Sequence, residues 1–307
     1  MMKTQFHLGA SLYVPATREP ENLVAIGNGK KFPQLRSVIF CTEDAVREDQ
    51  VAQALRNLKQ ALPSLKKTER PMRFIRVRNP HVLGRCLATA GIENIDGFVL
   101  PKVTCTNLRQ YQSFFASRDA FFLMPTLETA EVFDAREMTR LRELLQKDSN
   151  FRSRVLCLRI GGNDLLNCLR VRREPRHTIY DTPVGGLISR LAGEFIPHGF
   201  GLTAPVFEAM TRHDVLRQEI ELDLLHGLIG KTAIHPDQIQ VIEEQFAVEQ
   251  QDLEEAEQIL NPGAPAVFRM GDRMCEPTTH AHWARDILTR AEIYGVRGSV
   301  VPLRRAQ

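Results

Sequence analysis

The sequence predicts an α/β protein, a (β/α)₈ TIM barrel followed by a C-terminal helical extension. Eight short apolar runs occur between Leu8 and Ile234, and stretches of helical periodicity separate them. Eight alternations of strand and helix are typical of this barrel. No glycine-rich dinucleotide motif follows the first run, which argues against an open, doubly wound sheet.

The eight candidate strands are short and apolar at consecutive positions, as expected for strands buried on both faces. They cover residues 8–14, 37–41, 73–78, 97–100, 120–124, 155–160, 201–206 and 232–234.

The intervening helices are predicted from the spacing of their apolar residues. Val51, Leu55 and Leu58 lie on one face of a helix after the second strand. Residues 128–147 form a helical pattern after the fifth strand, and another helix follows the seventh. After the eighth strand, Pro236 occupies a position suited to the first turn of a helix.

The chain changes character after residue 246. An acidic helix over 249–260 is followed by a Pro/Gly cluster, a short strand-like run at 267–270, a turn and a last helix over 278–292. We therefore expect a barrel domain over 1–246. Residues 247–307 would form an extension that packs on the barrel or on a neighbouring subunit.

Composition excludes several classes of protein. The net charge is +3, from 40 basic and 37 acidic residues, which is too balanced for nucleic acid or a membrane surface as the main partner. The sequence has no long apolar segment and no recognisable signal peptide. Its six cysteines form no CxxC pair, which fits buried free thiols in a reducing compartment. We expect a cytoplasmic protein that binds neither nucleic acid nor membrane.

Polar residues follow most of the predicted strands, and barrel enzymes place their chemistry at that end. We expect these side chains to converge on one rim: Arg18, Glu43, Asp44, Arg76, Arg78, Lys102, Glu128, Asp164 and His235.

Carboxylates that face one another across a barrel mouth repel unless a positive charge lies between them. Because no histidine or cysteine cluster accompanies them, the sequence favours a hard divalent ion, Mg²⁺ or Mn²⁺. Neighbouring arginines would then bind a substrate carboxylate. The alternatives are local: Asp44 and Asp164 as helix N-caps, and Arg76 and Lys102 as solvated surface residues.

The sequence resembles the citrate lyase β-subunit-like branch of the HpcH/HpaI aldolase superfamily over most of its length. Seven segments carry the resemblance in order: Ser11-Leu-Tyr-Val-Pro15, Val38-Ile-Phe-Cys-Thr-Glu-Asp-Ala-Val46, Phe74-Ile-Arg-Val-Arg-Asn-Pro80, Gly97-Phe-Val-Leu-Pro-Lys102, Leu127-Glu-Thr-Ala130, Gly162-Asn-Asp-Leu165 and Gly230-Lys-Thr-Ala-Ile-His-Pro-Asp-Gln-Ile239.

This resemblance implies roles for individual residues. Glu128 and Asp164 would bind Mg²⁺, and Glu43 and Asp44 would hold waters of the ion. Arg76 would contact the substrate carboxylate or an enolate oxygen, and Lys102 would assist catalysis. The segment 271–276 resembles a tail motif that supplies an acid to a neighbouring subunit. Glu276 is thus either a trans-acting acid/base or a charge at a helix N-terminus.

The sequence also departs from the family pattern. Cys41 replaces an aspartate, and Arg78 stands where a small amide is usual. The segment Gly162-Asn-Asp-Leu165 has one residue fewer than the Gly-x-x-Asp-Leu motif of the family. The basic segment 169–177 has no counterpart, and its Arg172 and Arg173 could bind an anionic substrate tail or lie in a solvated loop.

The expected function is a Mg²⁺-dependent carbon–carbon lyase that cleaves or forms a hydroxy or keto acid, or its thioester, through an enolate. Arg18, Arg78, Arg172, Arg173 and His235 would bind the substrate. The altered residues at 41 and 78 motivate the alternative of a non-catalytic barrel that binds metal and ligand as a sensor or assembly subunit. The resemblance also implies a homo-oligomer, a trimer or hexamer.

Overall fold

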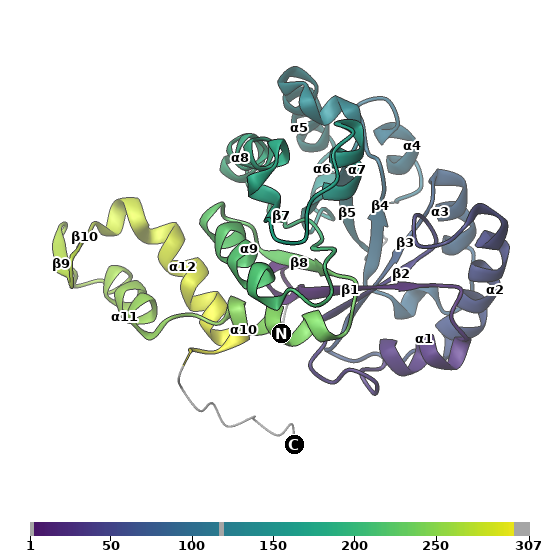
Figure 1. Ribbon diagram of the computed structural model, residues 1–307, viewed down its shortest axis with the longest axis horizontal. Coiled ribbons are helices and arrows are strands. Elements are labelled where there is room, and N and C mark those ends of the chain that lie inside the picture. The colour runs from purple at the N-terminus through teal and green to yellow at the C-terminus, as the bar shows by residue number, and fades with distance from the viewer. Residues whose placement is uncertain (1–2, 117–119, 298–307) are drawn as a thin grey trace. The chain divides into compact units, whose positions relative to one another are not determined.

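The computed structural model describes residues 3–116 and 120–297, and the chain divides into two compact units, 1–241 and 242–307 (Figure 1). The division falls inside helix α10 (Asp237–Phe246), close to the boundary predicted at residue 246. In the described part of the chain, no helix is long and apolar enough to cross a bilayer.

The first unit is built on eight parallel strands in the order β7-β6-β5-β4-β3-β2-β1-β8. A parallel bridge between Ala204 and Lys231 joins the two outer strands, so the sheet closes. The predicted TIM barrel is therefore confirmed. The strands are β1 (Gly9–Pro15), β2 (Ser37–Cys41), β3 (Met72–Arg76), β4 (Gly97–Leu100), β5 (Phe122–Leu127), β6 (Leu158–Ile160), β7 (Leu202–Thr203) and β8 (Gly230–Ala233).

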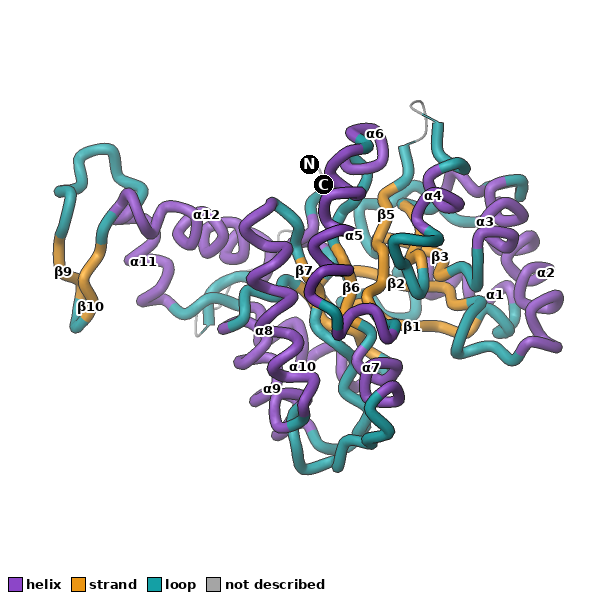
Figure 2. The backbone as a smooth tube through the Cα atoms, turned by 90° about the horizontal axis from the view of Figure 1, so that it is seen from above, coloured by secondary structure: helices purple, strands orange, loops and turns teal. Residues whose placement is uncertain are grey.

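Helices surround these strands in both views (Figures 1 and 2). Local sequence fixes where several begin: Asn79 and Thr182, each followed by proline, cap α3 and α8 with their side chains. Besides α10, the helices are α1 (Pro20–Gly27), α2 (Val51–Ala61), α3 (Pro80–Leu87), α4 (Leu108–Gln112), α5 (Ala135–Lys147), α6 (Ser149–Arg152), α7 (Gly162–Cys168), α8 (Pro183–Phe195) and α9 (His213–Leu225).

The helix predicted from residue 128 begins later than expected. Helix α5 starts at Ala135, where the Asp134 side chain accepts a hydrogen bond from the Arg136 N–H at 2.8 Å. A separate 3₁₀ turn covers Ala130–Phe133. Glu128 therefore lies directly after strand β5 and not in a helix, which lets its side chain extend into the barrel.

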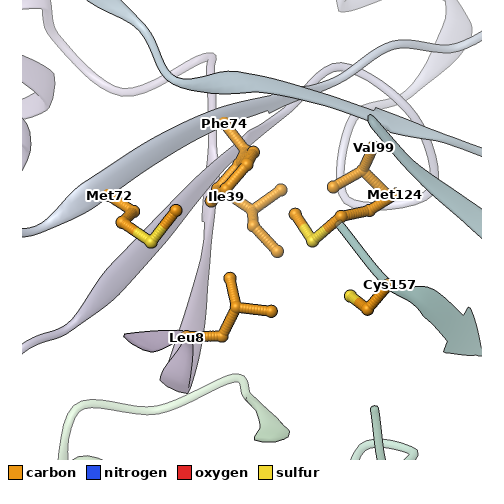
Figure 3. Close-up of a cluster of buried hydrophobic side chains, with 7 residues drawn as sticks. All are labelled: Leu8, Ile39, Met72, Phe74, Val99, Met124 and Cys157. Atoms are coloured by element: carbon orange, nitrogen blue, oxygen red, sulfur yellow. The ribbon is translucent and has the colours of Figure 1, made fainter. Parts of the chain in front are cut away.

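Apolar side chains form a buried cluster inside the barrel, below the carboxyl ends of the strands (Figure 3). Because side chains alternate along a strand, residues from successive strands meet there in one layer. This core cluster consists of Leu8, Ile39, Met72, Phe74, Val99, Met124 and Cys157, each at most 1% exposed. It forms a solid base beneath the carboxyl ends of the strands.

The second unit has a small core of its own. It contains α11 (Gln250–Ile259), the hairpin of β9 (Phe268–Met270) and β10 (Arg273–Cys275), and α12 (Pro277–Tyr294). Its buried side chains are Val248, Ala256, Ile259, Cys275, Ala284 and Ile287. The helical character predicted for the extension is thus confirmed, whereas its packing on the barrel or on a neighbour stays a prediction.

Candidate active site

The polar residues of the site continue the inward-facing side of the strands above the apolar base. Along β3, Phe74 belongs to the core and Arg76, two residues on, points to the same side. After Met124 in β5, Thr126 and Glu128 follow the same alternation. The alternation thus carries polar groups to the rim without disturbing the packing below them.

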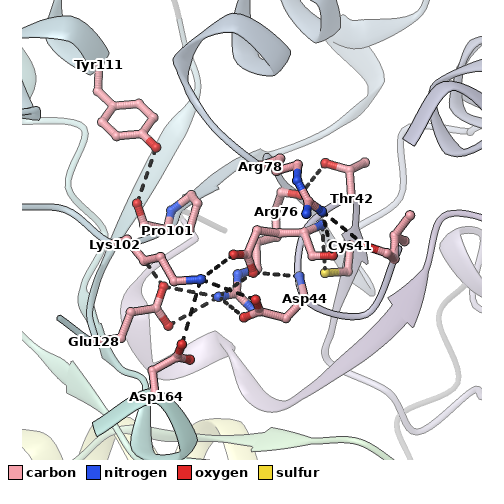
Figure 4. A network of polar contacts seen from close by, with 12 residues as sticks. Cys41, Thr42, Asp44, Arg76, Arg78, Pro101, Lys102, Tyr111, Glu128 and Asp164 are labelled. Atoms are coloured by element: carbon pink, nitrogen blue, oxygen red, sulfur yellow. Dashed lines mark hydrogen bonds and ion pairs between the residues drawn. The ribbon is translucent and has the colours of Figure 1, made fainter. Parts of the chain in front are cut away.

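Arg76 is the centre of an ionic cluster (Figure 4). Its Nη2 atom lies 2.8 Å from Glu43 Oε2, 2.9 Å from Asp44 Oδ2 and 3.1 Å from Glu128 Oε1. Arg76 is 7% exposed, and its Nε atom is buried without a hydrogen-bond partner. Arg76 therefore holds together three carboxylates from two parts of the rim, the segment after β2 and the end of β5.

Lys102 contacts the same carboxylates from the next strand. Its backbone N–H donates to Glu128 Oε1 at 2.9 Å, and its Nζ atom lies 2.7 Å from Glu43 Oε1. Asp164 Oδ1 is 3.7 Å from that Nζ atom. Lys102 has a φ of 51°, in the left-handed region. It lies in the turn after β4, and its own backbone N–H donates to Glu128 from this conformation.

Glu128 and Asp164 come together because the chain between them includes a glycine. Glu128 is 3% exposed, and Asp164, in the first turn of α7, lines the same cavity. A Cβ atom at Gly161 would overlap both Cβ and Oε2 of Glu128. Only glycine at position 161 leaves enough space for the Glu128 carboxylate.

Burial and mutual repulsion perturb the acids of the site. Burial, reinforced by the hydrogen bond with Asp44, raises the pKa of Glu43 to about 7. Burial also raises the pKa of Glu128, which the Arg76 charge partly opposes, and the pKa of Asp164, to which Asp44 adds. Burial alone would raise the pKa of Asp44, but its hydrogen bond to Glu43 and two nearby cations lower it.

The charges of this cluster fit a divalent cation. Four carboxylates (Glu43, Asp44, Glu128 and Asp164) face two cations, Arg76 and Lys102, so full ionisation leaves two negative charges in excess. In the described part of the chain, no group of three or more His, Cys, Asp or Glu is arranged to hold a metal. Mg²⁺ commonly uses one or two carboxylates and completes its shell with water and substrate. Glu128 and Asp164 match that demand.

A cavity of about 440 Å³ opens beside the cluster. Asp44, Arg76, Glu128 and Asp164 line it, together with polar side chains from the opposite strands. The volume suits a small ligand. Carboxylates that could hold an ion and cations that could bind an acid thus face the same cavity.

Tyr13, Arg159 and Thr232 are among the lining residues that were not foreseen from the sequence. Arg159 follows Cys157 on the inward side of β6 and is 2% exposed. A single arginine inside an apolar run looked like part of a buried strand. The alternation from the core residue Cys157 is the signal that could have assigned Arg159 to the cavity.

Cys41 and Arg78, the two residues that differ from the family pattern, support the loop that carries Glu43. The Cys41 thiol accepts a hydrogen bond from the Glu43 N–H at 3.4 Å. Arg78 donates to the carbonyls of Glu43 and Val46 at 3.4 and 3.1 Å. Both residues therefore fix the acidic segment.

The missing residue in the Gly-x-x-Asp motif was a misalignment. Counted from Gly161, which packs against Glu128, the segment Gly161–Asp164 has the full spacing. The deletion inferred from Gly162 was therefore wrong, and Asp164 is in register.

Several residues predicted to bind substrate do not line the cavity. Arg18 is exposed, and His235 lies beside Asp237, with 3.4 Å between Nδ1 and Oδ2. Arg172 is also exposed, whereas Arg173 is buried, pairs with Glu219 and donates to the Val206 carbonyl at 2.8 Å. Of these two arginines, Arg172 is thus exposed, whereas Arg173 forms a buried ion pair within the protein.

Glu276 belongs to the second unit. It precedes Pro277 at the start of α12, and its Oε2 accepts a hydrogen bond from the Thr279 hydroxyl at 3.1 Å. Its predicted role in a neighbour's site stays a prediction.

A closed (β/α)₈ barrel with clustered acids and cations at the carboxyl ends of its strands has the architecture of a barrel enzyme. Comparison with known sequences agrees with this class. A family model described as C–C bond lyase of the TIM-barrel fold matches residues 2–296. The chain belongs to this family, within the HpcH/HpaI aldolase and citrate lyase β-subunit-like group.

The individual proteins to which this chain is similar share at most 27% sequence identity with it among those described next. A (3S)-malyl-CoA thioesterase of Cereibacter sphaeroides is 27% identical over 247 residues, 79% of this chain and 78% of that protein. A CitE protein of Mycobacterium tuberculosis, solved with magnesium, acetoacetate and coenzyme A, gives a TM-score of 0.69 at 20% identity and covers 92% of this chain and 98% of that one. Malate synthase of Haloferax volcanii gives 0.65 at 15% identity, with 77% and 73% covered. The two structural likenesses show the fold.

Proposed function

We propose that this protein is a Mg²⁺-dependent carbon–carbon lyase, acting on a hydroxy or keto acid or its thioester through an enolate, in either direction. The observation that carries the proposal is the pair of carboxylates, Glu128 and Asp164, that line a ligand-sized cavity beside Arg76. Magnesium bound in the solved CitE relative supports the choice of ion.

Glu128 and Asp164 would hold the ion. When bound, Mg²⁺ would supply a Lewis acid that stabilises negative charge on a substrate oxygen. The Lys102 N–H and the Arg76 guanidinium hold the Glu128 carboxylate in one orientation. The positive charge of Arg76 also faces the cavity, where it stabilises an enolate oxygen.

Proton transfer falls to groups near the rim. Glu43, whose pKa is raised to about 7, can hold or release a proton near neutral pH. Asp44 lines the cavity and shares Arg76 and Lys102 with Glu43, so it connects that carboxyl to the ligand space. Glu276 of a neighbouring subunit is the second proposed acid/base.

The substitution Glu128→Gln tests the proposal. It keeps the shape of the side chain but removes a charged ligand. We expect Mg²⁺ affinity, measured by titration calorimetry, to fall at least roughly a hundredfold, and cleavage of malyl thioesters to stop. Glu131→Gln, an exposed acid three residues on, is the matched control and should behave as wild type.

Full activity of Glu128→Gln would contradict the proposal, as would a wild-type protein that binds no Mg²⁺ at millimolar concentration. Mg²⁺ binding without turnover of any hydroxy-acid thioester would favour the sensor or assembly subunit instead.

Thioester hydrolysis is a second candidate, because the curated relatives are named malyl-CoA thioesterases. The two reactions leave different products. Hydrolysis releases a thiol and keeps the carbon chain of the acid intact, whereas a lyase divides that chain. Mass spectrometry of the products from a malyl thioester separates them.

A further inference from the structure

Tyr13 carries a hydroxyl that has no hydrogen-bond partner in the described part of the chain. The residue pairs in register with Ile39 of the core cluster, and its ring packs against that cluster. Because Tyr13 is only partly buried and lines the cavity, its hydroxyl is available to a ligand there. A tyrosine that is largely buried usually has a partner for its O–H group, so a molecule that enters the cavity can serve as that partner.

Two arginines make the surroundings of this ring positive. The guanidinium carbons of Arg76 and Arg159 each lie 5.7 Å from the centroid of the Tyr13 ring. Burial raises the pKa of the Tyr13 hydroxyl, although the two arginine charges oppose the shift. The hydroxyl therefore keeps its proton at neutral pH and acts as a hydrogen-bond donor. The two positive charges nearby favour an acceptor that is itself negative.

The side-chain N–H groups of these arginines are partly engaged by the protein. Three carboxylates share Nη2 of Arg76, and Arg159 donates from its own Nη2 to the Thr232 hydroxyl at 2.6 Å. Tyr13 thus offers a free donor where the arginines raise the positive potential. Glu128 and Asp164 line the same cavity, so a ligand beside these acids also lies in the space that Tyr13 lines.

We propose that Tyr13 is a further catalytic residue, whose hydroxyl donates a hydrogen bond to the ligand oxygen that becomes negative during the reaction. The inference rests on the proposed function in one respect: that oxygen is taken to be the oxygen of the enolate. A hydrogen bond to a charged acceptor is about twice as strong as one to a neutral carbonyl. An interaction that strengthens as the charge develops lowers the barrier, and Tyr13 keeps its own O–H bond throughout.

Tyr13→Phe removes the hydroxyl and keeps the ring. We expect kcat for a malyl thioester to fall roughly a hundredfold, the order of effect of one lost donor to a developing oxyanion. KM should change by less than about threefold, because the bound substrate carries a neutral oxygen at this point. Tyr294→Phe, which removes a hydroxyl from α12 in the second unit, is the matched control and should behave as wild type. Thermal unfolding of both variants establishes that the barrel is intact.

Pyruvate and oxalate test the donor without turnover. Both have a carboxylate, and next to it pyruvate has a neutral carbonyl oxygen whereas oxalate has a charged one, as the enolate of pyruvate does. Titration calorimetry with and without Mg²⁺ gives the ratio of the oxalate affinity to the pyruvate affinity. We expect Tyr13→Phe to lower this ratio roughly tenfold, the effect of one charge-assisted hydrogen bond. Tyr294→Phe should leave the ratio unchanged.

If the wild type is an active lyase, an unchanged kcat in Tyr13→Phe would overturn the assignment. So would an equal weakening of both probes, since the hydroxyl would then not distinguish a charged oxygen from a neutral one. If the wild type turns over no malyl thioester but Tyr13→Phe still lowers the affinity ratio, the lyase proposal fails and the donor assignment stands. A wild type that binds neither probe would contradict both.

Discussion

The absence of a Cβ atom at Gly161 determines where the Glu128 carboxylate can lie. Its φ of −89° is accessible to any residue, so contact and not backbone strain makes glycine necessary here. We expect Gly161→Ala to push the Glu128 side chain aside and lower Mg²⁺ affinity roughly tenfold or more. A titration with Mg²⁺ measures the effect.

Gly193→Ala is the matched control. A Cβ atom at Gly193, within helix α8, meets nothing within 4 Å, so alanine should stabilise the helix by about 0.5–1 kcal/mol. If Gly161→Ala binds Mg²⁺ as tightly as Gly193→Ala does, the steric account of the Glu128 position is wrong.

Sequence patterns predict which residues lie at the carboxyl ends of the barrel strands more readily than they predict which residues form ion pairs. The acids at 43, 44, 128 and 164 were predicted to share one end of the barrel, and the structure brings them together around Arg76. The sequence could not show that Arg173 is buried, because the acid that pairs with it, Glu219, lies on a distant helix. Pairing across elements requires the fold.

Helix α9 is tied to strand β8 by a buried ionic network. Lys231 Nζ lies 2.9 Å from Glu219 Oε1 and 2.7 Å from Asp223 Oδ2, and all three side chains are fully buried. Tyr180 donates to Asp223 at 2.8 Å, which attaches the loop before α8 as well. The network therefore fastens the strand that closes the barrel.

We expect Lys231→Met to destabilise the protein by about 3–5 kcal/mol, because it leaves the buried Asp223 carboxylate without a cation and Glu219 with Arg173 alone. Denaturant unfolding measures the free energy. Lys59→Met, on the exposed side of α2, is the control and should unfold like the wild type. Equal stability of the two variants would show that the network contributes nothing.

At the level of elements, the strands could be predicted because buried parallel strands are apolar at most positions. The start of α5 could not, because residues 130–133 continue the helical periodicity as a 3₁₀ turn. The Asp134 cap, and not the apolar pattern, determines where the helix begins.

For the molecule as a whole, the predicted homo-oligomer and the predicted role of Glu276 can be tested together, because Glu276 can act in a neighbour's site only if an oligomer forms. Glu276 lies in the second unit, and the resemblance assigns it to a neighbour's site. Glu128→Gln and Glu276→Gln should each be inactive alone. Mixed oligomers should regain about a quarter of the wild-type activity, since half of the sites keep Glu128 and half of those receive an intact Glu276.

An enzyme assay on co-expressed, differently tagged variants measures the rescue. Tandem purification first establishes that mixed oligomers form. Mixed oligomers that stay inactive would rule out a trans-acting Glu276, and activity of Glu276→Gln alone would remove it from catalysis altogether.

The barrel interior stacks a polar layer on the apolar base of Leu8, Ile39, Phe74 and Met124. Within each strand the two layers come from different residues, two positions apart. Side chains that line the cavity, such as those at 159 and 232, can therefore be exchanged while the apolar base of the fold stays unchanged. Such a division allows new specificities to arise by few substitutions in an inherited scaffold.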